Sequence, residues 1–140
     1  MVAIRPAQAS DLPAVSALDA RLTGTDKPDY WQFMLDVPER HFLVAKTEKG
    51  VLAGFIAGEV RAWEFGQPAA GWVFAIQIEP RQRLKGVGTA LFDALVERFK
   101  AAGVTRVRTL VDRRDHLILS FFRAQGMVAG PSLQLDKDVS

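Results

Sequence analysis

The sequence of 140 residues contains no cysteine. This absence excludes disulfide bonds, thiolate metal sites and a cysteine nucleophile. Histidine occurs only twice, at His41 and His116, and neither lies in a carboxylate pattern that resembles a metal site. We therefore expect no bound metal and a cytoplasmic location.

Long apolar runs and a strong charge are also missing. No stretch reaches about 18 apolar residues, so no membrane-spanning helix and no membrane partner are expected. Residues 1–6 lack the apolar core of a signal peptide. The net charge is only +2 and the basic residues form no long run, which argues against a nucleic-acid partner. The length and the apolar fraction of 49% fit one domain over residues 1–140.

The most informative segment that is present covers residues 76–91, where an apolar strand runs into a basic turn and then into an amphipathic helix. The cationic and glycine positions of the turn are Arg81, Arg83, Lys85, Gly86 and Gly88. The start of a helix leaves N–H groups unpaired at the positive end of its dipole, and glycine lets the main chain approach an anion. The segment therefore predicts a site for a pyrophosphate-sized anion.

Two common phosphate-binding loops do not match this segment. A P-loop requires a lysine directly after its last glycine, but Thr89 follows Gly88. A dinucleotide-binding fingerprint requires a third glycine, and Leu91 occupies that position. These mismatches argue against a nucleoside triphosphatase and against a Rossmann-type dehydrogenase.

The remaining pattern, R-x-x-G-x-G, is formed by Arg83, Gly86 and Gly88 after a strand that ends Ile78-x-Pro80. It resembles the acyl-CoA-binding signature of the GNAT superfamily of N-acetyltransferases. The alternative is a glycine-containing turn that binds nothing. The resemblance implies an α+β fold with α/β/α layers, about four helices and a mixed, mostly antiparallel central sheet whose fourth and fifth strands splay apart.

Hydrophobic periodicity and turn residues predict the elements in the order of that fold. The expected strands are 3–6, 41–45, 51–60, 71–78, 106–111 and 133–135, and the expected helices are 10–22, 29–35, 87–102 and 116–125. The second half of the family signature is altered. Asp115, Ile118 and Phe122 stand where many members have Asn, Ala and Tyr, and Gly126-Met127 replaces Gly-Phe.

The resemblance also implies how acetyl-CoA would bind as cosubstrate. Backbone groups of Ile76, Gln77 and Ile78 would hold the pantetheine arm and polarise the thioester. The pyrophosphate would bind to the loop formed by Arg83, Leu84, Lys85, Gly86, Val87, Gly88 and Thr89. Asp115 and Phe122 occupy further CoA-binding positions of the family, although Asp115 is also explained as a helix cap.

The usual catalytic tyrosine of the family is replaced by Phe122, which cannot donate a proton. Tyr30 is the only tyrosine and could supply a hydroxyl from another direction, or it could be a packing residue. Three carboxylates are candidates for the general base. Asp112 could equally pair with Arg113 or Arg114, Glu79 could be a solvated loop residue, and Glu59 could point to solvent.

These features predict an N-acetyltransferase that moves an acetyl group to a primary amine by direct attack in a ternary complex. The alternatives are a catalytically inactive CoA-binding regulatory module and a domain that binds another phosphorylated ligand. We expect the first two helices and the turn at residues 63–70 to form the acceptor site, with tryptophans as candidate walls. The acceptor is not specified by the sequence, and the chain could be a monomer or a homodimer.

Overall fold

The computed structural model describes residues 1–140 and contains five strands and four α-helices. The chain forms two compact units, Met1–Leu110 and Val111–Ser140, and each is described by itself. The first unit holds the complete sheet and three of the helices, and the second unit holds the last helix.

The elements follow the predicted order as far as the last helix. They are β1 (Val2–Pro6), α1 (Leu12–Thr23), α2 (Pro28–Asp36), β2 (Arg40–Thr47), β3 (Leu52–Arg61), β4 (Ala70–Ile78), α3 (Val87–Ala101), β5 (Val107–Thr109) and α4 (His116–Ala124). Short 3₁₀ turns occur at Ala9–Asp11, Glu64–Gly66 and Pro80–Gln82. The fifth strand is shorter than the predicted range of 106–111, because regular pairing stops at Thr109.

The sheet has the strand order β1-β2-β3-β4-β5. The first four strands pair antiparallel, and β5 pairs parallel with β4. The predicted mixed, mostly antiparallel sheet is therefore confirmed. A parallel pair needs a crossover connection, and α3 provides it between β4 and β5.

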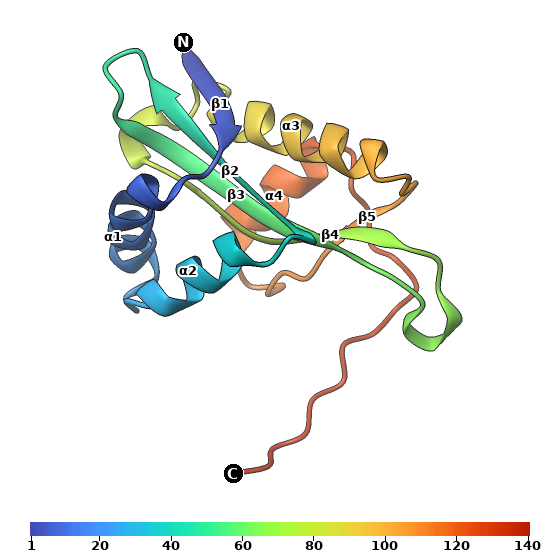
Figure 1. Cartoon of the computed structure of the whole chain (residues 1–140). Coiled ribbons are helices and arrows are strands. Elements are labelled where there is room, and N and C mark those ends of the chain that lie inside the picture. Colours follow the sequence, from blue (N-terminus) through green and yellow to red (C-terminus); the bar gives the residue numbers. More distant parts are fainter. The chain divides into compact units, whose positions relative to one another are not determined.

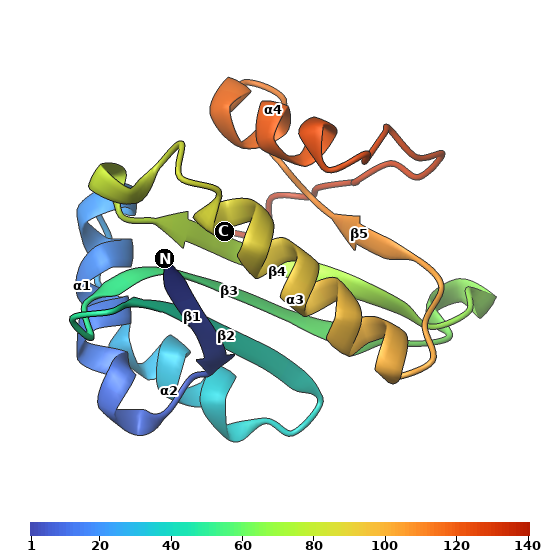
Figure 2. The same cartoon turned by 90° about the horizontal axis from the view of Figure 1, so that it is seen from above.

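Helices cover both faces of this sheet, with α1 and α2 on one face and α3 on the other (Figures 1 and 2). Side chains alternate between the two faces because successive residues of a strand point in opposite directions. On β2, Phe42 and Val44 join the apolar cluster that contains Trp31 of α2 and Val15 of α1. The first unit thus has the predicted α/β/α layers.

The α3 layer packs closely because two strand positions have no side chain. A Cβ atom at Gly71 would lie 2.2 Å from the ring of Phe99, and one at Gly58 would lie 3.0 Å from it. Phe99 is fully buried. Glycine at these two positions therefore makes the space that the aromatic ring of α3 fills.

The predicted last strand at residues 133–135 is wrong. No strand follows α4, and the side chains of Leu133 and Leu135 are 85% and 88% exposed. Two leucines in alternation are a weak strand signal, since a strand also needs a neighbour for its backbone hydrogen bonds. None of the helices has the length and apolar composition required to cross a membrane.

Candidate active site

The fourth and fifth strands separate halfway along β4. They pair only over three steps, Gly71 with Val107, Trp72 with Arg108 and Val73 with Thr109. At the last step the hydroxyl of Thr109 donates a hydrogen bond of 2.9 Å to the carbonyl of Val73. Beyond it β4 continues to Ile78 without a neighbour on this side, so the predicted splay is confirmed (Figure 2). Such an open strand edge can pair with an extended ligand.

A β-bulge lies at the same point of β4. Ala57 of β3 pairs with Ala75, but the next residue, Gly58, pairs with Val73, so Phe74 has no partner on β3. A bulged residue leaves the ladder of hydrogen bonds locally unpaired and bends the strand. Nothing in the local sequence indicated this bulge. The bulge at Phe74 therefore directly follows Val73, the last residue of β4 that pairs with β5.

The glycine turn after β4 has the geometry of an anion site. Gly86 caps the N-terminus of α3 in the left-handed conformation, with φ of 80°, and Leu84 has a positive φ of 65°. The N–H of Ala90 donates to the carbonyl of Gly86 at 3.0 Å, as the first bond of the helix. The N–H groups of Val87 and Gly88 precede that bond and point out of the helix start. A left-handed non-glycine residue such as Leu84 is strained, and such strain is concentrated at binding sites.

The cations of this turn are available to a ligand. Arg81, Arg83 and Lys85 are exposed, and none of them forms an ion pair with a carboxylate of the chain. Open space also surrounds Gly86, where a Cβ atom would meet nothing within 4 Å. The turn therefore presents positive charge and helix-start amides on one accessible surface.

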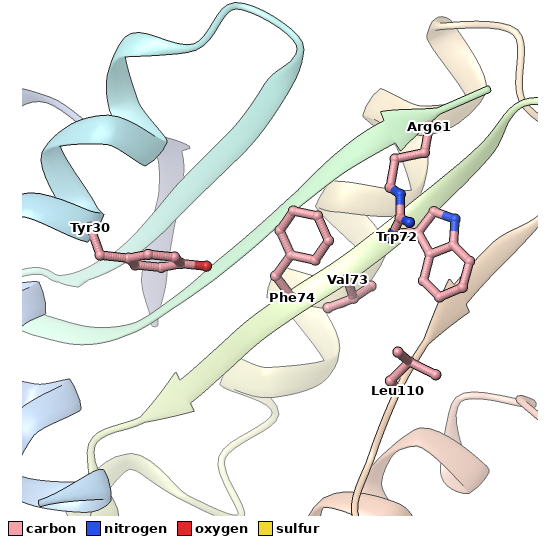
Figure 3. A pocket seen from close by; sticks show the side chains of 6 residues that line it. All are labelled: Tyr30, Arg61, Trp72, Val73, Phe74 and Leu110. Carbon is pink, nitrogen blue, oxygen red and sulfur yellow. The ribbon is translucent and has the colours of Figure 1, made fainter. Parts of the chain in front are cut away.

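A pocket of about 270 Å³ lies at the other end of the exposed stretch of β4. Its walls come from α2, from the end of β3, from β4 and from the residue after β5 (Figure 3). The lining side chains are Tyr30, Arg61, Trp72, Val73, Phe74 and Leu110. Residues 63–70, which were expected to border the acceptor site, do not line it.

The one charged side chain of the pocket is already neutralised. The guanidinium of Arg61 stacks on the ring of Trp72 at 4.7 Å. It also donates two hydrogen bonds, of 2.7 and 2.9 Å, to the carboxylate of Glu64. A bidentate pair of this kind satisfies both partners, and Glu64 itself does not line the pocket.

Tyr30 is the one predicted catalytic residue that lines the pocket. Its side chain is 38% exposed, and its hydroxyl points toward Phe74 (Figure 3). Burial raises the pKa of Tyr30, an effect that the nearby Arg40 and Lys27 partly oppose. The phenol is therefore a neutral O–H donor at physiological pH.

Glu59 and Glu79 occupy different surroundings. Glu59 pairs across the sheet with Trp72, and its carboxylate accepts a hydrogen bond of 3.2 Å from Arg40. Trp72 lines the pocket, and directly paired residues of neighbouring strands share one face of the sheet, so Glu59 lies on the pocket side. Glu79 directly follows β4, in the segment that leads into the glycine turn, and accepts a hydrogen bond of 2.8 Å from Arg21 of α1.

The other predicted site residues belong to the second unit. The carboxylate of Asp112 accepts two hydrogen bonds, of 3.0 and 2.8 Å, from the guanidinium of Arg114. This pairing lowers the pKa of Asp112 and makes it a weaker base. Asp115 caps α4 by accepting the N–H of Ile118 at 3.1 Å, and Phe122 is buried with its ring 5.3 Å from that of Phe121.

The remaining aromatic and imidazole candidates are distributed over the molecule. Trp72 lines the pocket, whereas Trp31 is buried in the core and Trp63 is 71% exposed. His41 lies edge-on to Phe99 at 5.5 Å, and burial lowers its pKa. No group of three or more histidine and carboxylate side chains is arranged to hold a metal ion.

Comparison with known families and curated proteins gives a consistent assignment. The family model described as "Acetyltransferase (GNAT) family" matches residues 7–127. A mycothiol acetyltransferase of Propionibacterium freudenreichii subsp. shermanii is 33% identical over 84 residues, which is 60% of this chain. The chain spans only about a quarter of that relative, since the match covers 26% of its length.

Solved structures share the fold over the whole chain. The aminoglycoside 6'-N-acetyltransferase AAC(6')-Ih of Acinetobacter baumannii superposes with a TM-score of 0.87 at 16% identity, covering 100% of both chains. The aminoglycoside N-acetyltransferase AAC(6')-Iy, solved in complex with CoA, gives a TM-score of 0.88 at 16% identity and covers 100% of this chain and 96% of its own. At this identity the likeness concerns the fold.

Proposed function

Because the chain belongs to the acetyltransferase (GNAT) family, we propose that it transfers an acetyl group from acetyl-CoA to a primary amine. One observation carries this proposal. A single strand, β4, connects the pocket at Trp72–Phe74, the unpaired edge at 76–78 and the cationic turn that opens α3. An extended acyl-CoA requires such a continuous path, with its phosphates at one end and its thioester at the other.

Different residues along β4 and the glycine turn would bind the different parts of acetyl-CoA. The start of α3 and the cations Arg83 and Lys85 would receive the pyrophosphate. The pantetheine arm carries amide groups, and it would pair with the exposed backbone of Ile76, Gln77 and Ile78. The bulge at Phe74 would then offer backbone N–H groups to the thioester oxygen as it gains negative charge.

The reaction follows as one displacement in a ternary complex. The neutral amine nitrogen attacks the thioester carbon, so an N–C bond forms and the C–S bond breaks. The nitrogen gives up a proton, and the CoA thiolate gains one. The products are the acetylated amine and CoA thiol, and no covalent bond to the protein is needed.

Two residues suit the proton transfers. We assign the donor role to Tyr30, because its phenol is protonated and faces the pocket. Glu59 is the cross-strand partner of Trp72, which lines the pocket, and its carboxylate would accept the amine proton through water.

This assignment does not use Phe122, whose ring has no acidic proton. It also does not use Asp112, because Arg114 holds both of its oxygens. Glu59, in contrast, accepts a hydrogen bond from Arg40 at one oxygen.

Calorimetric titration with acetyl-CoA tests the donor half of the proposal, with dephospho-CoA and ATP as comparison ligands. We expect micromolar binding selective for acetyl-CoA. Absence of binding would mean that the glycine turn is only structural. Release of CoA thiol in the presence of an amine panel, checked by the mass of the product, tests the transfer itself.

A second candidate function is a CoA-binding module without transferase activity. Phe122 favours it, because this residue stands at the position of the family's usual acid. The two functions differ in one result. A regulatory module would bind acetyl-CoA and release no thiol with any amine, whereas a transferase would release thiol and acetylated amine in equal amounts.

A further inference from the structure

We infer that the acceptor is a primary amine carried on one small aromatic or apolar group, and not a polycation. This inference rests on the proposed transferase function and names the acceptor class for the same site. The aminoglycoside acetyltransferases that share the fold are too distant in sequence, at 16% identity, to specify the acceptor of this chain.

The walls of the pocket are mainly apolar rings and aliphatic groups. Trp72, Phe74 and Tyr30 provide three aromatic rings, and Val73 and Leu110 provide aliphatic surface. Phe74 is 38% exposed and Leu110 is 63% exposed, although both are large apolar side chains. A ligand that covers them removes apolar surface from water, which is the main favourable term in binding an apolar group.

The pocket is positioned for acetyl transfer. Val73 and Thr109 form the last pair of β4 and β5. Phe74 directly follows Val73 in sequence, and Leu110 directly follows Thr109. These two side chains therefore stand where the strands part, next to the bulge. A ring held there would place its amine beside the backbone that faces the thioester in the proposed complex.

The charged groups around the pocket do not favour the binding of a polycation. No carboxylate lines it, and its one charged group is the guanidinium of Arg61, which Glu64 neutralises. Glu59 is likewise held by Arg40. Additional ammonium groups of an acceptor would lose water without gaining a free anionic partner, and this desolvation is costly.

The volume of the pocket fits a group of this size. A cavity of about 150 Å³ is large enough to hold benzene in a protein core. The pocket here measures about 270 Å³, which leaves room for one ring and a short aminoalkyl chain.

Paired steady-state assays test this specificity. Phenethylamine and neamine serve as probes, acetyl-CoA is kept constant, and CoA thiol release gives kcat/KM for each amine. We expect kcat/KM for phenethylamine to exceed that for neamine by at least about tenfold, the scale on which apolar pockets discriminate. Equal or higher kcat/KM for neamine would overturn the inference and leave the transferase function intact.

A carboxylate introduced into the pocket wall, compared with one introduced elsewhere on the surface, tests whether this pocket determines the preference between amines. Leu110→Glu adds a carboxylate to the exposed wall, and Val51→Glu adds one to an exposed residue at the β2–β3 turn. We expect Leu110→Glu to lower the phenethylamine-to-neamine ratio of kcat/KM by about tenfold and Val51→Glu to leave it unchanged. Equal behaviour of the two variants would contradict the assigned pocket.

Direct binding separates this inference from the proposed function. Acetyl-CoA binding is first measured without any amine, and its failure would remove the transferase proposal and the inference together. If acetyl-CoA binds and no amine is turned over, phenethylamine is titrated into the CoA-loaded protein. Saturable binding that Leu110→Glu weakens supports the pocket assignment, and no binding overturns it.

Discussion

The two ends of β4 are built in different ways. At the proposed donor end, residues 76–89, the main chain presents an open strand edge, a left-handed Gly86 and the start of α3. At the acceptor end, the pocket is made of side chains from four separate segments. The donor end keeps its cations unpaired, whereas Arg61, the cation of the acceptor end, is held by a carboxylate.

This difference follows from the chemistry of the two ligands. A pyrophosphate is recognised by amides and charge in any sequence that can form the turn, so the main chain is sufficient. The proposed acceptor would be recognised by shape and by apolar contact, which side chains provide. Substitutions at one end should therefore affect one substrate and spare the other.

The largest expected effect is at Gly86. The substitution Gly86→Glu puts a carboxylate into the phosphate site and a side chain on a residue with φ of 80°. We expect acetyl-CoA affinity to fall by more than about a thousandfold, because an unpaired like charge at a binding site costs several kcal/mol. Calorimetry measures the affinity, and acceptor binding should persist.

The β2–β3 turn offers a matched control for this variant. Gly50 has φ of 78° and, as at Gly86, a Cβ atom added there would meet nothing within 4 Å. The substitution Gly50→Glu therefore introduces the same charge and the same backbone strain away from the glycine turn. If both variants lost affinity to the same degree, the effect would come from destabilisation and not from the phosphate site.

The second-largest expected effect is on kcat, and it distinguishes Glu59 from Glu79. We expect Glu59→Gln to lower kcat by about a hundredfold, the scale of a lost general base, while acetyl-CoA affinity stays constant. Glu79→Gln serves as the control, since Glu79 is bound to Arg21 near the donor end. We expect it to change kcat by less than about threefold, so equal losses in the two variants would contradict the role of Glu59.

The donor end could be predicted from sequence because it is local. The strand, the glycine turn and α3 are continuous in the chain, and the family resemblance that they carry placed the splay between the correct strands. The strand at 133–135 was predicted on equally local grounds and is wrong. Its two leucines alternate correctly, but pairing depends on a neighbouring strand that local sequence does not reveal.

The acceptor end could not be predicted because it is assembled from distant segments. Tyr30, Arg61 and Leu110 meet around β4 only in the folded chain. The hydrogen-bond partners of the two glutamates also come from distant segments. Arg40 donates to Glu59, and Arg21 donates to Glu79. The bulge at Phe74 depends on the register with β3, and it has no signature in the sequence.

A smaller effect tests the hydroxyl of the acceptor end. The substitution Tyr30→Phe keeps the ring that lines the pocket and removes only the proton donor. We expect kcat to fall by about tenfold with KM for the amine unchanged, because a good thiolate leaving group depends only partly on acid catalysis. A rise in KM at constant kcat would instead make Tyr30 a wall of the pocket without a role in proton transfer.

The smallest expected effect concerns charge at the donor end. Lys85 is exposed and unpaired, and Lys49 in the β2–β3 turn is exposed and unpaired as well. We expect Lys85→Ala to weaken acetyl-CoA binding by about threefold at low salt, and Lys49→Ala to have no effect. The difference should shrink as salt screens the interaction, since exposed charges act over about 10 Å at 0.1 M salt. Affinity that depends on Lys85 equally at all salt concentrations would indicate a direct, desolvated contact, and the donor end would then rely on a side chain as the acceptor end does.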